Sequence, residues 1–202
     1  MSESIARKTA KNSIYSIIAN GWYLISRFLL TPFVLMYLNL EEYGLWMLCF
    51  VAVSFLALSS MGFESTYIKF VAEYHARDEI DRTNRLLSTG LVMSTLFSLA
   101  VILIVWAGMD LVLDVLKIEP HMRGSASLLL LGTCLVFMLD ISFNCFGRAL
   151  DGMQFMHLTA RVRLITSFIE IILIVIFLLS GMGVFGMLAA FLLRYILAII
   201  IN

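Results

Sequence analysis

The chain has 202 residues, of which 61% are hydrophobic and 14% are charged, with a formal net charge of zero and a mean hydropathy of +0.98. Soluble domains carry about 25% charged residues, so this composition excludes a water-soluble globular protein. The neutral net charge argues against nucleic acid as a partner. Cys49, Cys134 and Cys145 all lie in apolar segments, and we interpret them as buried thiols rather than a disulfide framework.

Six apolar segments are long enough to cross a membrane as helices, because about 20 residues cover a hydrocarbon core of ~30 Å. In chain order they are residues 13–38, 43–63, 86–108, 125–146, 164–180 and 184–202. They are continuously apolar and lack the alternation of β-barrel strands. We therefore predict an all-α integral membrane protein with six transmembrane helices, connected by a short acidic turn at 39–42, polar segments at 69–85, 110–123 and 147–163, and a glycine turn at 181–183.

The basic residues predict the orientation of these spans. If the N-terminus is cytoplasmic, the outer side holds only Lys117 and Arg123. The cytoplasmic side then holds ten basic residues, which are Arg7, Lys8, Lys11, Lys69, Arg77, Arg82, Arg85, Arg148, Arg161 and Arg163. Lysine and arginine are enriched on the cytoplasmic side of membrane proteins, so we expect a cytoplasmic N-terminus.

Polar side chains follow one face of the first span. They recur every three or four residues within an arc of about 80°, at Ser13, Ser16, Asn20, Tyr23, Arg27 and Thr31. Arg27 lies near the middle of the span, where an ionisable residue costs roughly 2.5–3.5 kcal/mol on insertion scales and usually faces protein or a water-filled cavity. We favour a cavity-lining role for this face. The alternative is packing against neighbouring helices, with Arg27 in a structural ion pair.

Four further ionisable residues fall within predicted spans: Glu64, Asp140, Glu170 and Arg194. Asp140 either pairs with Arg27 or carries a coupling proton or cation, and we favour a paired or otherwise satisfied polar role. Glu170 shares a helix face with Arg163 and Thr166, which favours a structural network. Glu64 and Glu170 lie toward the cytoplasmic ends of their helices, where water is near, and the sequence names no partner for Arg194.

Motifs of known catalytic chemistry are missing from the sequence. It contains no G-x-S-x-G elbow, H-E-x-x-H helix, phosphate-binding loop or Cys-x-x-Cys pair. We therefore expect no enzyme activity, no metal site and no cofactor.

Residues 11–91 resemble the opening of a known family. The first part reads KNSIYSIIANGWYLISRFLLTPFVLMYLNLEEYGLWML, with a mid-helix arginine, a proline shortly after it, and a short turn into E-E-Y-G-L-W. The second reads LSSMGFESTYIKFVAEYHARDEIDRTNRLLSTGL, with a K-F-x-A-E-Y segment and a polar loop ending in N-R-L-L-S. These features are similar to those of the Wzx-type flippases for lipid-linked oligosaccharides, which are O-antigen and related exporters related to the MATE drug exporters.

The resemblance implies two six-helix lobes, usually with 12–14 helices in all, around a central cavity that opens alternately to each side. This chain would be the N-terminal lobe, completed by a C-terminal lobe or a second copy, in the bacterial inner membrane. Its substrate would be an undecaprenyl-pyrophosphate-linked oligosaccharide, and Arg27 would give the pyrophosphate an electrostatic partner. Many relatives have an acidic residue where this chain has Ser60-Met61, and Glu64 is not assumed to replace it.

Three other functions remain open. A cation-coupled, MATE-like exporter of small molecules should place carboxylates rather than arginine in its cavity. A membrane-embedded glycan polymerase or transferase should carry a large outer loop or an acidic metal motif, which this chain lacks. A non-transporting assembly subunit should tolerate neutralisation of every intramembrane charge.

Overall fold

The computed structural model describes residues 2–58 and 61–201, with side chains described for residues 14–55 and 65–201. This part of the chain is helical, without strands, which confirms the all-α prediction. The helices are α1 (Ser2–Val34), α2 (Leu40–Leu58), α3 (Met61–Ala76), α4 (Ile80–Ala107), α5 (Met109–Val115), the 3₁₀ turn η1 (Pro120–Met122), α6 (Arg123–Gly152), α7 (Met156–Leu179) and α8 (Gly183–Ile201).

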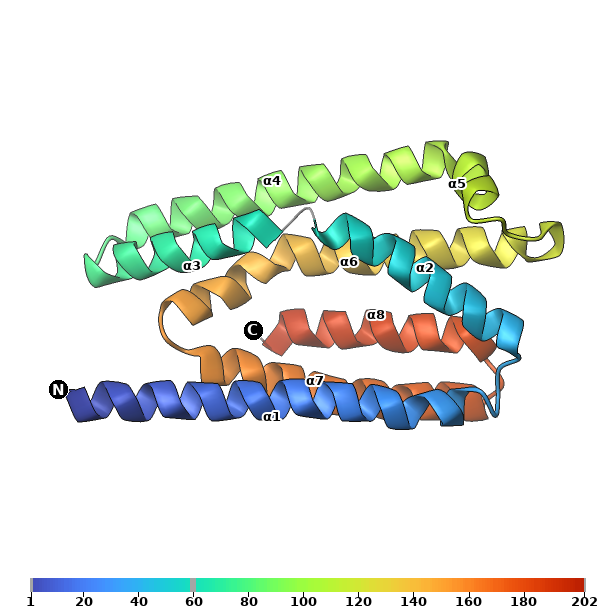
Figure 1. Ribbon diagram of the computed structural model, residues 1–202. Helices are drawn as coiled ribbons and strands as arrows, with labels where there is room; N and C mark the ends of the chain where they lie inside the picture. The colour runs from blue at the N-terminus through green and yellow to red at the C-terminus, as the bar shows by residue number, and fades with distance from the viewer. Residues whose placement is uncertain (1, 59–60, 202) are drawn as a thin grey trace.

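The long helices run back and forth along one axis (Figure 1). Helices α1, α4 and α7 point one way, whereas α2 with α3, α6 and α8 point the other way. Helix α6 lies in the middle and packs against α2, α3 and α4 on one side and against α8 on the other. Helix α7 packs against α8, and α1 covers α7. The N-terminus, the α3–α4 connection and the α6–α7 connection therefore lie at the same end of the bundle (Figure 1).

The helices have the length and surface of membrane spans. Five in the described part are long and apolar enough to cross a membrane, within Ile14–Val34, Ile80–Ala107, Pro120–Gly152, Met156–Leu179 and Gly183–Ile201. Large apolar side chains point outward, including Phe28 at 81% exposure and Ile104 at 71%. Such a surface is stable when hydrocarbon covers it. The predicted span 43–63 corresponds to α2 and the start of α3, with residues 59–60 outside the described part, and it is not among the five.

Two connections are shorter than the polar segments suggested. Residues 69–85 were expected to connect two spans, but α3 continues to Ala76 and α4 begins at Ile80. Residues 147–163 likewise belong mostly to α6 and α7. The reason is that a helix satisfies its own backbone groups in water as well as in lipid, while charged side chains on its surface remain solvated. At the α3–α4 connection, Glu73 pairs with the exposed Arg77 at 2.9 Å and Glu79 pairs with the exposed Arg82 at 3.0 Å.

Local sequence sets the tight turns. At the start of α2, the Asn39 side chain accepts a hydrogen bond from the Glu42 backbone N–H at 2.7 Å, and the Glu42 carboxylate accepts one from the Asn39 N–H at 3.3 Å. This reciprocal arrangement is a capping box. Between α7 and α8, Gly181 and Gly183 have φ of +77° and +58°, which glycine adopts without steric cost.

An aromatic cluster joins α2, α6 and α8 at the core. Phe191 lies edge-on to Trp46, Phe50 and Phe137, with ring centroids 6.1, 5.5 and 6.2 Å apart, and to Tyr195 at 5.1 Å. Such edge-to-face pairs stabilise beyond the burial of their area. The cluster fixes α8 on α6 and so positions the charged side chains that α8 carries.

Candidate functional site: a buried arginine–glutamate–arginine cluster beside a polar hollow

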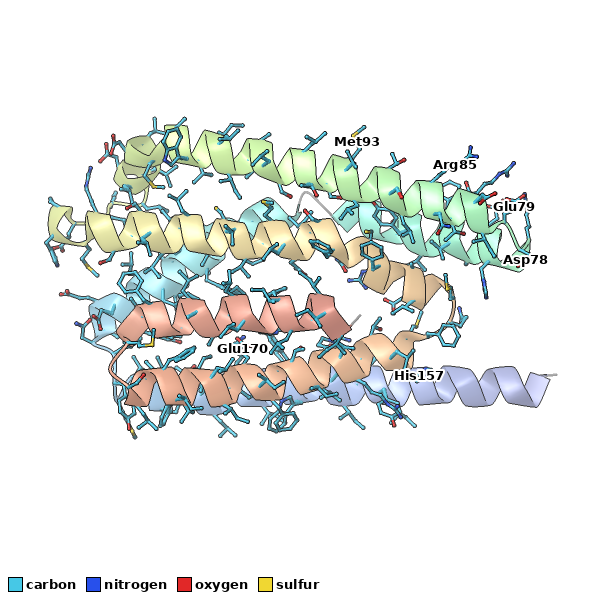
Figure 2. The ribbon with its side chains drawn as sticks, turned by 180° about the vertical axis from the view of Figure 1, so that it is seen from behind. Asp78, Glu79, Arg85, Met93, His157 and Glu170 are labelled. Atoms are coloured by element: carbon cyan, nitrogen blue, oxygen red, sulfur yellow. The ribbon has the colours of Figure 1, made fainter. Side chains whose placement is uncertain are left out.

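Three helices bring two arginines onto one glutamate inside the bundle. Arg27 of α1 donates from Nη2 to Glu170 Oε1 of α7 at 2.6 Å, and Arg194 of α8 donates from Nη1 to Glu170 Oε2 at 3.0 Å. The Glu170 side chain is 2% exposed, against 11% for Arg194 and 33% for Arg27. Figure 2 shows Glu170 between α7 and α8. One carboxylate therefore links α1, α7 and α8.

The Tyr23 ring completes this cluster. It lies 5.1 Å from the Arg27 guanidinium and 5.7 Å from that of Arg194, as a cation–π partner of both. Tyr23 is one helical turn before Arg27, which explains why both side chains face α7. Thr31, one turn further along, donates to the Arg27 backbone carbonyl at 2.9 Å, so its hydroxyl is satisfied within α1.

The cluster carries an excess of positive charge. Arg27, Arg194 and Glu170 sum to a formal charge of +1 in an apolar bundle. Charges removed from water are costly unless they are paired and hydrogen-bonded. Both Glu170 oxygens are already occupied, so an anion approaching this cluster meets a net attraction.

A polar hollow of about 510 Å³ opens beside the cluster, between the end of α6, the start of α7 and the end of α8. Its charged and amide side chains are Asp140, Asn144, Arg148, Asp151, Arg163 and Arg194. Arg194 belongs both to this lining and to the Glu170 cluster. Among the residues with described side chains, no three His, Cys, Asp or Glu gather as a metal site would require.

The rim of the hollow is fixed by the turn between α6 and α7. Asp151, near the end of α6, accepts a hydrogen bond from the Thr159 hydroxyl at 2.8 Å and pairs with Arg148 at 3.3 Å. Next to it, Gly152 lies against α3, where an added Cβ would be only 2.9 Å from the Ile68 carbonyl oxygen. The hollow therefore has a rigid wall at this end.

The polar residues predicted as one stripe on α1 do not share one environment in the structure. Arg27 and Tyr23 meet α7, whereas Asn20 is exposed and Ser16 is half-buried. None of these residues of α1 lines the hollow, and neither does Thr31, whereas Asp140 does. The partner of Arg27 is Glu170, not Asp140, and the same Glu170 is the partner that the sequence did not name for Arg194. The Glu64 side chain lies outside the described side chains.

Three residues of the hollow were missed as site candidates: Arg148, Asp151 and Arg163. The sequence does place Arg148 in a weak polar stripe with Thr133, Asp140 and Asn144, and Asp151 continues this face of α6 three residues later. The sequence could not show that this face meets the arginines of α7 and α8.

Comparison with known proteins identifies the family. The sequence matches the family of polysaccharide biosynthesis proteins over residues 9–202, which is nearly the whole chain. No curated protein and no solved structure matches it significantly. The chain is thus a helical membrane protein that belongs to the polysaccharide biosynthesis protein family.

Proposed function

We propose that the protein is a flippase that moves an undecaprenyl-pyrophosphate-linked oligosaccharide from the cytoplasmic to the outer leaflet. The observation that carries this proposal is the net positive Arg27–Glu170–Arg194 cluster inside a membrane bundle of the polysaccharide biosynthesis family. Moving a diphosphate through hydrocarbon requires compensating charge, and guanidinium groups supply it with bidentate hydrogen bonds. No covalent chemistry is needed, so we propose a transporter and not an enzyme.

The charges of the hollow favour an anionic over a cationic substrate. Its lining contains three arginines, Arg148, Arg163 and Arg194, against two aspartates, Asp140 and Asp151. A cation-coupled exporter of small molecules would need the opposite balance. This alternative is therefore less well supported, although Asp140 remains its best candidate for a coupling residue.

Arg27 has two roles in this proposal. In the structure it holds Glu170, and its side chain is a third exposed. We propose that it turns to the pyrophosphate at mid-depth, while Arg194 keeps the carboxylate neutralised. The remaining polar residues of α1, Ser16, Asn20, Tyr23 and Thr31, would line the central cavity formed with a C-terminal lobe or a second copy of the chain, with membrane lipids around both.

We further propose that the protein lies in the bacterial inner membrane with its N-terminus in the cytoplasm. Ala76 is the last residue of α3 and Glu119 follows α5, and both are exposed. The α3–α4 connection and α5 lie at opposite ends of the bundle (Figure 1). In intact cells, a membrane-impermeant maleimide should label Glu119→Cys and spare Ala76→Cys. The reverse pattern would overturn the orientation.

The function is tested by translocation in vesicles that contain the full-length protein. A lipid-diphosphate oligosaccharide should become accessible to a lectin on the opposite face only when the protein is present. Arg27→Ala should abolish this movement, Arg27→Lys should retain part of it, and Arg85→Ala, which removes an exposed cation of α4, should change nothing. Full translocation by Arg27→Ala would refute the role of Arg27. Drug efflux driven by a cation gradient, without movement of the lipid, would refute the flippase.

A further inference from the structure

One arginine of the hollow, Arg163, forms no direct ion pair among the side chains that the structure describes. Arg148 pairs with Asp151, and Arg194 shares Glu170 with Arg27. The charged groups that act on the Arg163 guanidinium are Arg148 and Arg194, which repel it, and Asp151.

Arg163 lies nearer the end of the bundle than the Glu170 cluster does. Arg163 precedes Glu170 by seven residues on α7, which places it about 10 Å nearer the end of the bundle. Arg148 and Arg163 therefore stand toward the α6–α7 turn, and Arg194 stands deeper, beside Glu170. An anion that enters from this end meets Arg163 before it reaches the Glu170 cluster.

We propose that the hollow is a binding site for a phosphate-bearing anion, held between Arg163, Arg148 and Arg194, and that its occupant competes with Glu170 for Arg194. The hollow has the volume of a small-ligand pocket, and a guanidinium binds phosphate through paired N–H donors. Asp140 and Asp151 on the same lining supply acceptors for hydroxyl groups, which suits a phosphate attached to a sugar.

The competition for Arg194 follows from the shared geometry. Arg194 reaches Glu170 at 3.0 Å from the same position at which it lines the hollow. The two exchanges are successive. While a phosphate in the hollow holds Arg194, Glu170 keeps Arg27 at 2.6 Å, so the carboxylate remains paired. Binding in the hollow thereby lowers the formal charge around Glu170 from +1 to zero, because Arg194 of α8 leaves while Arg27 of α1 stays. When the pyrophosphate moves on to Arg27 at mid-depth, Arg194 returns to Glu170. The site rests on the proposed function only for its natural ligand, which would be the pyrophosphate of the lipid-linked sugar.

The site is tested with inorganic pyrophosphate, titrated calorimetrically into the purified full-length protein in neutral detergent. Saturable binding is expected, weakened at least about tenfold by Arg163→Gln, because a charge-assisted bidentate contact is lost. The matched control is Arg161→Gln, two residues away on α7, whose guanidinium contacts the Tyr15 hydroxyl at 3.1 Å outside the hollow. Absence of saturable binding, or equal affinity in the wild type and Arg163→Gln, would overturn the proposal.

The competition has a separate readout in residues that do not line the hollow. Glu170→Gln removes the competitor for Arg194 and should tighten pyrophosphate binding, by an amount within the roughly 5–150-fold range of ordinary site coupling. Arg27→Ala leaves Glu170 to Arg194 alone and should weaken the binding. A purely structural role would give no change or a loss in both variants. Unchanged or weakened binding in Glu170→Gln protein that retains its native helicity would therefore overturn the competition.

The source of the phosphate is resolved in nanodiscs. If phosphatidylglycerol discs abolish pyrophosphate binding that neutral-lipid discs permit, the phosphate comes from a lipid headgroup. If binding is equal in both, the site takes a phosphate that is not part of the bulk lipid. Binding that persists in a protein without translocation activity would refute the flippase and leave this site intact, whereas translocation without pyrophosphate binding would refute the site alone.

Discussion

Replacement of Glu170 by glutamine removes the only formal negative charge in the cluster while keeping the size of the side chain. The glutamate is 2% exposed and accepts from Arg27 at 2.6 Å and from Arg194 at 3.0 Å. Removing one partner of a buried ion pair costs about 3–5 kcal/mol, since the remaining charge stays buried without compensation. Glutamine still offers one oxygen acceptor, so we expect a loss in the free energy of unfolding near the lower limit, about 3 kcal/mol.

The measurement is reversible unfolding in mixed micelles, followed by helicity. The matched control is Glu73→Gln, which makes the same substitution in the exposed pair of Glu73 with Arg77 and should cost less than about 1 kcal/mol. A triple variant, Arg27→Met with Glu170→Leu and Arg194→Met, should recover most of the lost stability, because a buried ion network can be replaced by apolar side chains at little cost. The reasoning is refuted if Glu170→Gln costs no more than the control, or if the triple variant is less stable than Glu170→Gln.

Three further predictions concern packing, the turn between α6 and α7, and the cysteines. Gly152→Ala should lower the free energy of unfolding by about 1–3 kcal/mol, because its Cβ would press on the Ile68 carbonyl. In the control Gly124→Ala, in the same helix, the added Cβ meets no neighbour within 4 Å, so this variant should be neutral or slightly stabilising. Equal effects of the two substitutions would contradict the close packing of α6 on α3. Thr159→Val removes the donor to Asp151 and should cost about 1–3 kcal/mol by the same assay, against almost no change for the exposed Thr89→Val; a neutral Thr159→Val would show that this bond does not stabilise the turn. Cys49, Cys134 and Cys145 are all buried free thiols. A membrane-impermeant maleimide should therefore label none of them in the native protein and all three after unfolding. Rapid labelling of the native protein would contradict the helix packing.

The sequence alone was sufficient for the class of fold. Continuous apolar segments and a low content of charge can be stable only as helices in a membrane, because every backbone polar group must find its partner within the segment. The glycine turn at 181–183 was equally local, since it depends on the conformational freedom of glycine. Segment 39–42 was assigned to a turn, whereas α2 already begins at Leu40 behind the Asn39 cap. The ends of the helices were less accessible, because a helix does not end where its residues become polar.

The candidate site divides in the same way. Arg27, Glu170 and Arg194 were each conspicuous in the sequence, because an ionisable residue in a membrane span needs a reason. Their joining was not visible, because Arg27 and Glu170 are 143 positions apart and meet only when α1 packs on α7. The hollow is a further product of tertiary structure: the ends of α6 and α8 and the start of α7 meet there, and no local pattern states which helices will be neighbours. Residue chemistry thus determined which side chains needed partners, and helix packing decided which partners they received.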